Sequence, residues 1–222
     1  MNIFEILGPV MVGPSSSHTA GAVRIGYMAR KILGEAPVRA EILLHGSFAA
    51  TGSGHGTDRA LLAGLLGMEP DDSRIPESRE EARRAGLVYS FASVNLRDAH
   101  PNTAVLTLWG ESGRSVKVQA SSLGGGRIMV NKIDDIRVDF TGEKPTLIVQ
   151  NEDKPGVLAS ITYALSAQDV NIATLQLYRN RRGGYAFTIA ETDSDIGEAV
   201  LAELREMEGV LKVIRIASEE EL

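Results

Sequence analysis

The 222-residue chain contains no cysteine. It therefore cannot form a disulfide, a thiolate zinc site or a cysteine nucleophile, and it has no thiolates with which to hold an iron–sulfur cluster by itself. No hydrophobic run approaches the ~20 residues of a membrane-spanning helix, and the first residues lack the basic and apolar segments of a signal peptide. Lysine and arginine number 23 against 29 aspartates and glutamates, so the basic excess of a nucleic-acid binder is missing. We expect a cytoplasmic protein that binds neither membranes nor nucleic acids.

The residues that are present fit a globular protein of one or two domains, with 43% hydrophobic and 23% charged residues. The net charge of −6 comes from one end of the chain. Residues 1–145 contain 16 basic and 16 acidic side chains, whereas residues 146–222 contain 7 and 13. All four histidines lie in the first part. This asymmetry predicts two domains of different chemistry.

The first part mixes helical and strand-like segments, which predicts an α+β domain. Its strands have alternating or β-branched residues, its helices have apolar side chains at helical spacing, and a charged stretch at 75–86 is expected to be a solvated helix or connector. The expected strands are 38–44, 87–96, 103–109, 115–121 and 127–131, and the expected helices are 20–33 and 59–66.

The second part begins after a polar hinge at 140–145. We place the domain boundary there, with one domain at 1–143 and another at 144–222. The order of elements in the second domain is βαββαβ, the ferredoxin-like arrangement. The expected strands are 146–150, 171–178, 185–191 and 210–216, and the expected helices are 157–168 and 197–207.

Residues 146–222 resemble an ACT domain, a small regulatory module that senses amino acids. The resemblance rests on Leu147-Ile148-Val149, the turn from Asn151 to Leu158 and the start of the next strand. The Pro155-Gly156 turn opens a helix whose first N–H groups can hold a carboxylate; the alternative is a plain strand-to-helix turn. ACT modules usually pair side by side, so the resemblance implies a homodimer of the isolated chain and an amino-acid effector. The implied effector-binding residues are Asn151, Asp153, Pro155, Gly156, Val157, Leu158, Asn171 and Ile172.

Three polar clusters in the first domain are candidates for chemistry. The first places hydroxyl groups and a histidine before the helix expected at 22–33, where a helix N-terminus favours an anion. One hydroxyl would suffice for a helix cap, so the excess favours ligand binding. The residues are Ser15, Ser16, Ser17, His18 and Thr19.

The second cluster combines His45-Gly46-Ser47 with the glycine-rich segment 51–58. His55 lies between two glycines, which lets the backbone approach a ligand closely and favours a catalytic or binding role. His45 ends an apolar strand, so a structural hydrogen bond and a functional role remain equally open for it.

The third cluster is His100-Pro101-Asn102, between two expected strands, and a functional loop and a polar turn are both open. The histidine spacings of 27, 10 and 45 residues match no compact zinc motif, so we expect no metal ligands. The sequence also lacks the Gly-x-Ser-x-Gly motif of many hydrolases.

Taken together, residues 2–140 resemble the β subunit of the iron–sulfur-dependent bacterial L-serine dehydratases. The matching motifs run in order: 4–9, 13–21, 45–47, 51–58, 100–102 and 122–126. The resemblance implies a lyase of amino-acid degradation and gluconeogenesis that converts L-serine to pyruvate and ammonia. It also implies a 4Fe-4S cluster ligated by a separate α subunit, with which the lack of cysteine here agrees.

The resemblance suggests roles for the three clusters. We expect Ser15, Ser16, Ser17, His18 and Thr19 to bind the substrate carboxylate, and His55, His100 and Asn102 to transfer protons or orient the substrate. Which histidine acts as the base stays open. The first domain also resembles the allosteric substrate-binding domain of some phosphoglycerate dehydrogenases, so the alternative is a non-catalytic module that binds an anion or an amino acid.

Overall fold

The computed structural model describes residues 11–13, 15–52 and 56–217. The chain divides into two compact units, one of residues 1–134 and one of residues 135–222. The sequence predicts a later boundary, between residues 143 and 144. Strand β6 (Ile136–Phe140) follows residue 134 but belongs to the six-stranded sheet of the preceding strands. For this reason we keep the later boundary as a proposal.

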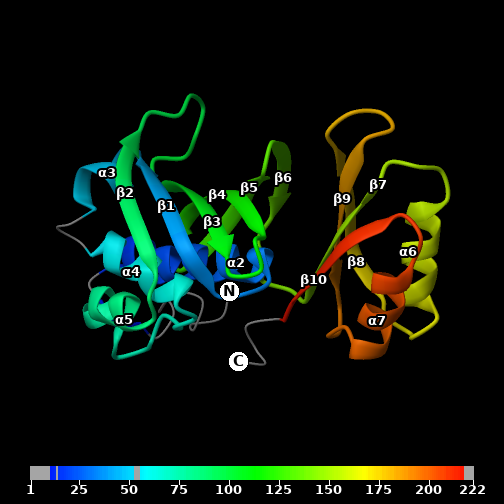
Figure 1. The fold of residues 1–222 in the computed structure, drawn as a ribbon, viewed down its shortest axis with the longest axis horizontal. Coiled ribbons are helices and arrows are strands. Elements are labelled where there is room, and N and C mark those ends of the chain that lie inside the picture. Colours follow the sequence, from blue (N-terminus) through cyan, green and yellow to red (C-terminus); the bar gives the residue numbers. More distant parts are fainter. Residues whose placement is uncertain (1–10, 14, 53–55, 218–222) are drawn as a thin grey trace. The chain divides into compact units, whose positions relative to one another are not determined.

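That sheet has the order β2-β1-β3-β4-β5-β6. Strands β1 and β2 are parallel, and β1–β3, β3–β4 and β4–β5 are antiparallel. Helices α2 and α4 lie behind β1 to β4 in Figure 1. The strands are β1 (Pro37–His45), β2 (Val88–Val94), β3 (Thr103–Gly110), β4 (Ser115–Gly124) and β5 (Arg127–Ile133), and the helices are η1 (Ser16–Ala20), α2 (Gly21–Leu33), α3 (Gly46–Thr51), α4 (Thr57–Leu65), η2 (Ile75–Glu77) and α5 (Ser78–Arg84).

Side-chain alternation along the strands builds the core of this unit. In β1, Ala40, Ile42 and Leu44 are buried, whereas the residues between them are partly exposed. Helix α2 packs against α4 and against strands β3, β4 and β5. One face of the sheet is therefore covered by helices, and burying its apolar side chains stabilises the unit.

The expected strands and helices around this sheet are confirmed, but three local features were not predicted. The residues before α2 form the π-helical turn η1, which Ser15 caps through a hydrogen bond from the His18 N–H. The segment after His45 begins with the short helix α3. Strand β6 was missed, although Ile136, Val138 and Phe140 alternate as a strand requires.

The C-terminal unit has the expected βαββαβ order, and its sheet has the order β10-β7-β9-β8 with every pair antiparallel. One side of the sheet packs on both helices through apolar residues such as Leu147, Ile161 and Leu201. The α+β class and the ferredoxin-like arrangement are thus confirmed. The elements are β7 (Thr146–Glu152), α6 (Val157–Ser166), β8 (Ile172–Arg179), β9 (Tyr185–Thr192), α7 (Glu198–Glu206) and β10 (Val210–Ile216).

Among the described residues, no helix combines the length and the apolar character needed to span a membrane.

Candidate functional site

The serine-rich turn at the start of α2 is organised around one histidine. Ser17 Oγ lies 3.1 Å and Ser15 Oγ lies 3.5 Å from His18 Nδ1. Ser15 Oγ also accepts the His18 N–H at 3.2 Å. The turn runs directly into α2, so its hydroxyl groups stand at the positive end of that helix dipole.

The second cluster meets the first through Ser47 at the start of α3. Ser47 Oγ lies 3.1 Å from His18 Nε2, so hydroxyl groups contact both ring nitrogens. The buried Phe48 ring packs edge-on against the imidazole, with the ring centroids 5.4 Å apart. A neutral imidazole donates through one nitrogen and accepts through the other. His18 therefore links two segments far apart in the sequence in one ordered hydrogen-bond network.

The third cluster is attached to the second through the backbone. The Ser47 N–H donates to the Pro101 carbonyl oxygen at 2.8 Å, and the Phe48 N–H lies 3.5 Å from the same oxygen. Gly46 permits this approach. It has a φ of 57°, and a Cβ atom there would lie 2.6 Å from the Pro101 oxygen. The structure thus brings parts of the three predicted clusters, the serine-rich turn, Ser47 and the turn at Pro101, together at the carboxyl end of β1.

The His100–Asn102 turn is held at both ends. Thr103 Oγ1 donates to the His100 carbonyl oxygen at 2.6 Å, and the Ser122 N–H donates to the Asn102 carbonyl oxygen at 2.9 Å. The Asn102 N–H also donates to His100 Nδ1 at 3.2 Å. In the neutral ring the proton then lies on Nε2. The exposed His100 imidazole is therefore oriented to donate a hydrogen bond from Nε2.

His45 forms hydrogen bonds with the backbone at the end of β2 and just beyond it, and none is seen to the hydroxyl cluster among the described residues. The Leu96 N–H donates to His45 Nδ1 at 3.2 Å, which favours the structural role that the sequence left open. His55 lies outside the described residues, so its proposed role stays a prediction.

Ser47 and Ser122 were not predicted as site residues. Both lie in the motifs that carry the family resemblance, beside Gly46 and before the glycines at 124–126. Within the described residues, Thr19 Oγ1 and Ser122 Oγ are buried and have no hydrogen-bond partner. Buried hydroxyl groups are normally satisfied. A water molecule or a ligand oxygen beside the turn would satisfy these two.

The chemistry of the cluster favours binding and orienting a polar substrate. Its hydroxyl groups, imidazoles and helix N-terminus are hydrogen-bond donors suited to a carboxylate. The residues do not fit an iron–sulfur cluster, because the sequence has no thiolate. The described residues also contain no group of three histidine or acidic side chains arranged to hold a metal ion.

In the C-terminal unit, most of the proposed effector residues lie around the turn between β7 and α6. Asn151 is 2% exposed, and its amide accepts from Thr188 Oγ1 and donates to the Glu152 carbonyl oxygen, both at 2.9 Å. Asp153 accepts from the Gly183 N–H at 2.9 Å. These two side chains are therefore already engaged in holding the turn.

The remaining effector residues are more open. Pro155 and Gly156 are exposed, Leu158 is partly exposed, and Val157 is nearly buried. Gly156 has a φ of 91°, and helix α6 has no side-chain cap. The uncapped first turn of α6 is thus the part of the predicted effector site best suited to a carboxylate. Ile172, at the start of β8, is partly exposed.

Asn171 supplies a prediction on pH dependence. Its side-chain amide donates to Asp193 at 2.6 Å, and this bond, with the nearby Lys144 ammonium, lowers the pKa of Asp193 from its ordinary value. A lowered folded-state pKa adds stability above the ordinary carboxyl range, and this stability is lost as the pH falls through the folded pKa. We expect Asn171→Ala and Lys144→Gln each to raise the pKa of Asp193, as measured by a carboxyl ¹³C NMR titration. An unchanged pKa in Asn171→Ala would contradict the assignment of its hydrogen bond as a cause.

Comparisons with known proteins agree with both units. A family model described as serine dehydratase beta chain matches residues 2–88, and an ACT domain model matches residues 145–209. L-serine dehydratase, beta chain, of Peptoniphilus asaccharolyticus is 41% identical over 198 residues, which are 89% of this chain and 89% of that protein. The probable L-serine dehydratase, beta chain, of Bacillus subtilis is 36% identical over 216 residues, 97% of this chain and 98% of that protein. L-serine dehydratase of Streptomyces coelicolor is 31% identical over 155 residues, covering 58% of this chain and 33% of that protein.

The fold and the matches define a two-unit α+β protein whose second unit is an ACT domain. The chain belongs to the L-serine dehydratase beta chain family.

Proposed function

We propose that this chain is the β subunit of an iron–sulfur-dependent L-serine dehydratase, which converts L-serine to pyruvate and ammonia together with a separate α subunit that carries a 4Fe-4S cluster. The name beta chain in two relatives supports a partner subunit. The Streptomyces coelicolor enzyme supports it further, since the region similar to this chain makes up only a third of that protein. The absence of cysteine here leaves the cluster ligands to the partner.

The observation that carries the proposal is the network in which Ser15, Ser17 and Ser47 surround the His18 imidazole. Dehydration of serine requires a fixed carboxylate, loss of the α-proton and departure of the β-hydroxyl group. The serine-rich turn, with Ser16 and Thr19, binds the carboxylate through hydroxyl groups at the start of α2. Orienting the substrate in this way accounts for a large part of the rate enhancement in many enzymes.

Proton transfer is assigned to the remaining candidates. His100, with its proton on Nε2, donates a hydrogen bond to the substrate, and Asn102 orients it. His55 is the other candidate for proton transfer. The two residues are tested by His55→Ala and His100→Ala in the reconstituted enzyme, and near wild-type turnover in both variants would remove their catalytic role.

The decisive experiment is an anaerobic assay of pyruvate formation from L-serine. The chain is tested alone, the cluster-bearing partner alone, and then both together. Activity only in the mixture supports the proposal. Binding of L-serine without activity in the mixture would instead support the alternative, a non-catalytic module that binds an amino acid or an anion.

The ACT domain is proposed to bind an amino-acid effector, with L-serine as the first one to test, at the start of α6. The isolated chain is proposed to be a homodimer, which analytical ultracentrifugation measures. Isothermal titration of the full chain with L-serine tests the effector, and Asn151→Ala tests whether the turn must be ordered. No heat in either protein would require another effector.

A further inference from the structure

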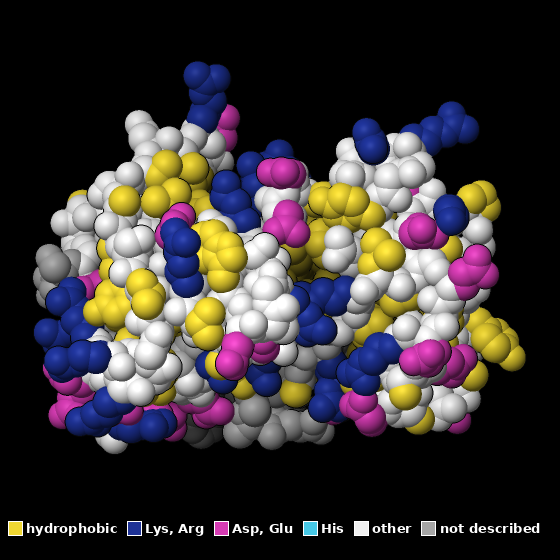
Figure 2. Space-filling view, viewed as in Figure 1, with side chains coloured by type: hydrophobic (Ala, Val, Ile, Leu, Met, Phe, Trp, Pro, Cys, Tyr) yellow, Lys and Arg dark blue, Asp and Glu magenta, His cyan; other side chains and the backbone are white. Residues whose placement is uncertain are grey.

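A recess of about 550 Å³ lies on the N-terminal unit between α5 and β2. It shares no lining residue with the hydroxyl cluster around His18. Strand β2 is the outer strand of its sheet, and α5 leads into it through the turn at Gly86. Figure 2 shows basic and acidic side chains gathered at the lower left, where α5 lies. The volume is within the range of small-molecule sites.

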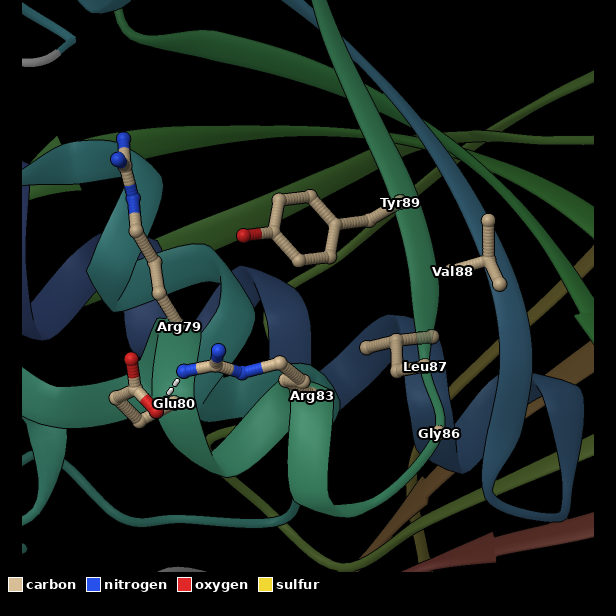
Figure 3. A pocket seen from close by; sticks show the side chains of 7 residues that line it. All are labelled: Arg79, Glu80, Arg83, Gly86, Leu87, Val88 and Tyr89. Atoms are coloured by element: carbon tan, nitrogen blue, oxygen red, sulfur yellow. Dashed lines mark hydrogen bonds and ion pairs between the residues drawn. The ribbon is translucent and has the colours of Figure 1, made fainter.

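The recess combines two guanidinium groups with a phenol hydroxyl. Figure 3 shows Tyr89 projecting from β2 toward α5, on the side from which Arg79 and Arg83 rise. Leu87 lines the base and is 5% exposed. Tyr89 packs edge-on against Phe91, with the ring centroids 5.8 Å apart. The aromatic wall is therefore fixed by packing within β2.

The two arginines differ in how they are held. Arg79 pairs with Asp58, whose side chain is only 8% exposed, at the start of α4. This pair fixes the position of the Arg79 guanidinium, which has five N–H donors and so keeps others for a ligand. Arg83 pairs with Glu80, and both side chains are more than half exposed. Such a pair contributes little to stability, so Arg83 can exchange Glu80 for a ligand at small cost.

We propose that this recess binds a small carboxylate that carries an apolar or aromatic body. The carboxylate lies between the Arg79 and Arg83 guanidinium groups and accepts from the Tyr89 hydroxyl, because guanidinium groups match carboxylates in charge and geometry. The body of the ligand lies against the Tyr89 ring. Gly86 leaves the rim open, since a Cβ atom built there meets nothing within 4 Å. This site is independent of the proposed dehydratase function.

The test is an NMR titration of the full 222-residue chain with three probes: benzoate, which has both the charge and the ring, acetate, which lacks the ring, and benzamide, which lacks the charge. We expect benzoate to shift the amide resonances of residues 86–89 and to bind more tightly than either other probe. No shift with benzoate at millimolar concentration would overturn the proposal. Equal affinity for benzamide would also overturn it, because the arginines would then contribute nothing.

Two matched variants test whether Arg83 contributes to benzoate binding. Arg83 and Arg84 are both exposed residues of α5, and each pairs with a glutamate three residues earlier, but Arg84 is not part of the recess lining. We expect Arg83→Gln to weaken benzoate binding about tenfold, the effect of losing a charged hydrogen bond, and Arg84→Gln to leave it unchanged. Equal weakening in both variants would show a general charge effect and overturn the assigned site.

Discussion

Replacing His18 by alanine is expected to lower kcat/KM of the proposed two-subunit enzyme by about 100-fold or more, a typical effect of losing a positioned acid–base or hydrogen-bonding group. His18 is the residue on which Ser17 and Ser47 converge, at 3.1 Å each. Without the imidazole, the serine-rich turn and the start of α3 lose their common partner. The measurement is steady-state kinetics of pyruvate formation at saturating partner subunit.

Two further variants test whether the loss of kcat/KM in His18→Ala comes from the hydrogen-bond network and not from a general loss of stability. Ser47→Ala removes one hydrogen bond to the imidazole and is expected to lower kcat/KM about fivefold, since one such bond is worth ~1 kcal/mol. Ser93→Ala removes an exposed serine of β2 and should leave the kinetics unchanged. A correctly folded His18→Ala enzyme with near wild-type kcat/KM would show that this network does not bind the substrate.

The prediction of elements from the sequence succeeded where one local signal dominates. The βαββαβ order of the second domain follows from short apolar strands separated by turns such as Pro155-Gly156, and the structure reproduces it. Strand β6 was missed because its three buried residues lie next to the polar segment at 140–145. The π-helical turn η1 was missed because it depends on the Ser15 cap, whose geometry no residue pattern specifies.

The residue types of the candidate site could be predicted from the sequence, but the hydrogen-bond partners within it could not. Histidines and hydroxyl groups beside glycines point to a polar site, and parts of the three clusters do meet. The pairing of His18 with Ser47 depends on a contact across 29 positions. It is set by the route of β1 and by the φ of 57° at Gly46. Sequence spacing carries no information on such a contact, so His18 and Ser47 could not be linked in advance.

Where α2 crosses α4, helix propensity and the packing in the structure predict opposite effects of a glycine-to-alanine substitution on stability. Gly64 lies inside α4, where replacing glycine by alanine ordinarily stabilises a helix by about 1 kcal/mol. In the structure, a Cβ atom on Gly64 would lie 2.0 Å from the Val23 carbonyl oxygen and 2.6 Å from the Tyr27 nitrogen. Across the same crossing, a Cβ atom on Gly26 would lie 2.3 Å from the Leu61 carbonyl oxygen. These are backbone atoms, so no side-chain rotation relieves the contact and the helices must move apart.

Gly64→Ala is therefore expected to lower the free energy of unfolding by about 3 kcal/mol, the upper range for overpacking a core, and to lower Tm by about 10 °C. Differential scanning calorimetry of the full chain measures both. Gly197→Ala is the control, because Gly197 has a φ of −65° and open space at its Cβ position; it loses only the preference of the α7 N-cap for glycine, an effect below about 1 kcal/mol. An unchanged or raised Tm in Gly64→Ala would mean that α2 and α4 do not cross at these glycines. Since the serine-rich turn continues into α2, the placement of His18 would then also have to be revised.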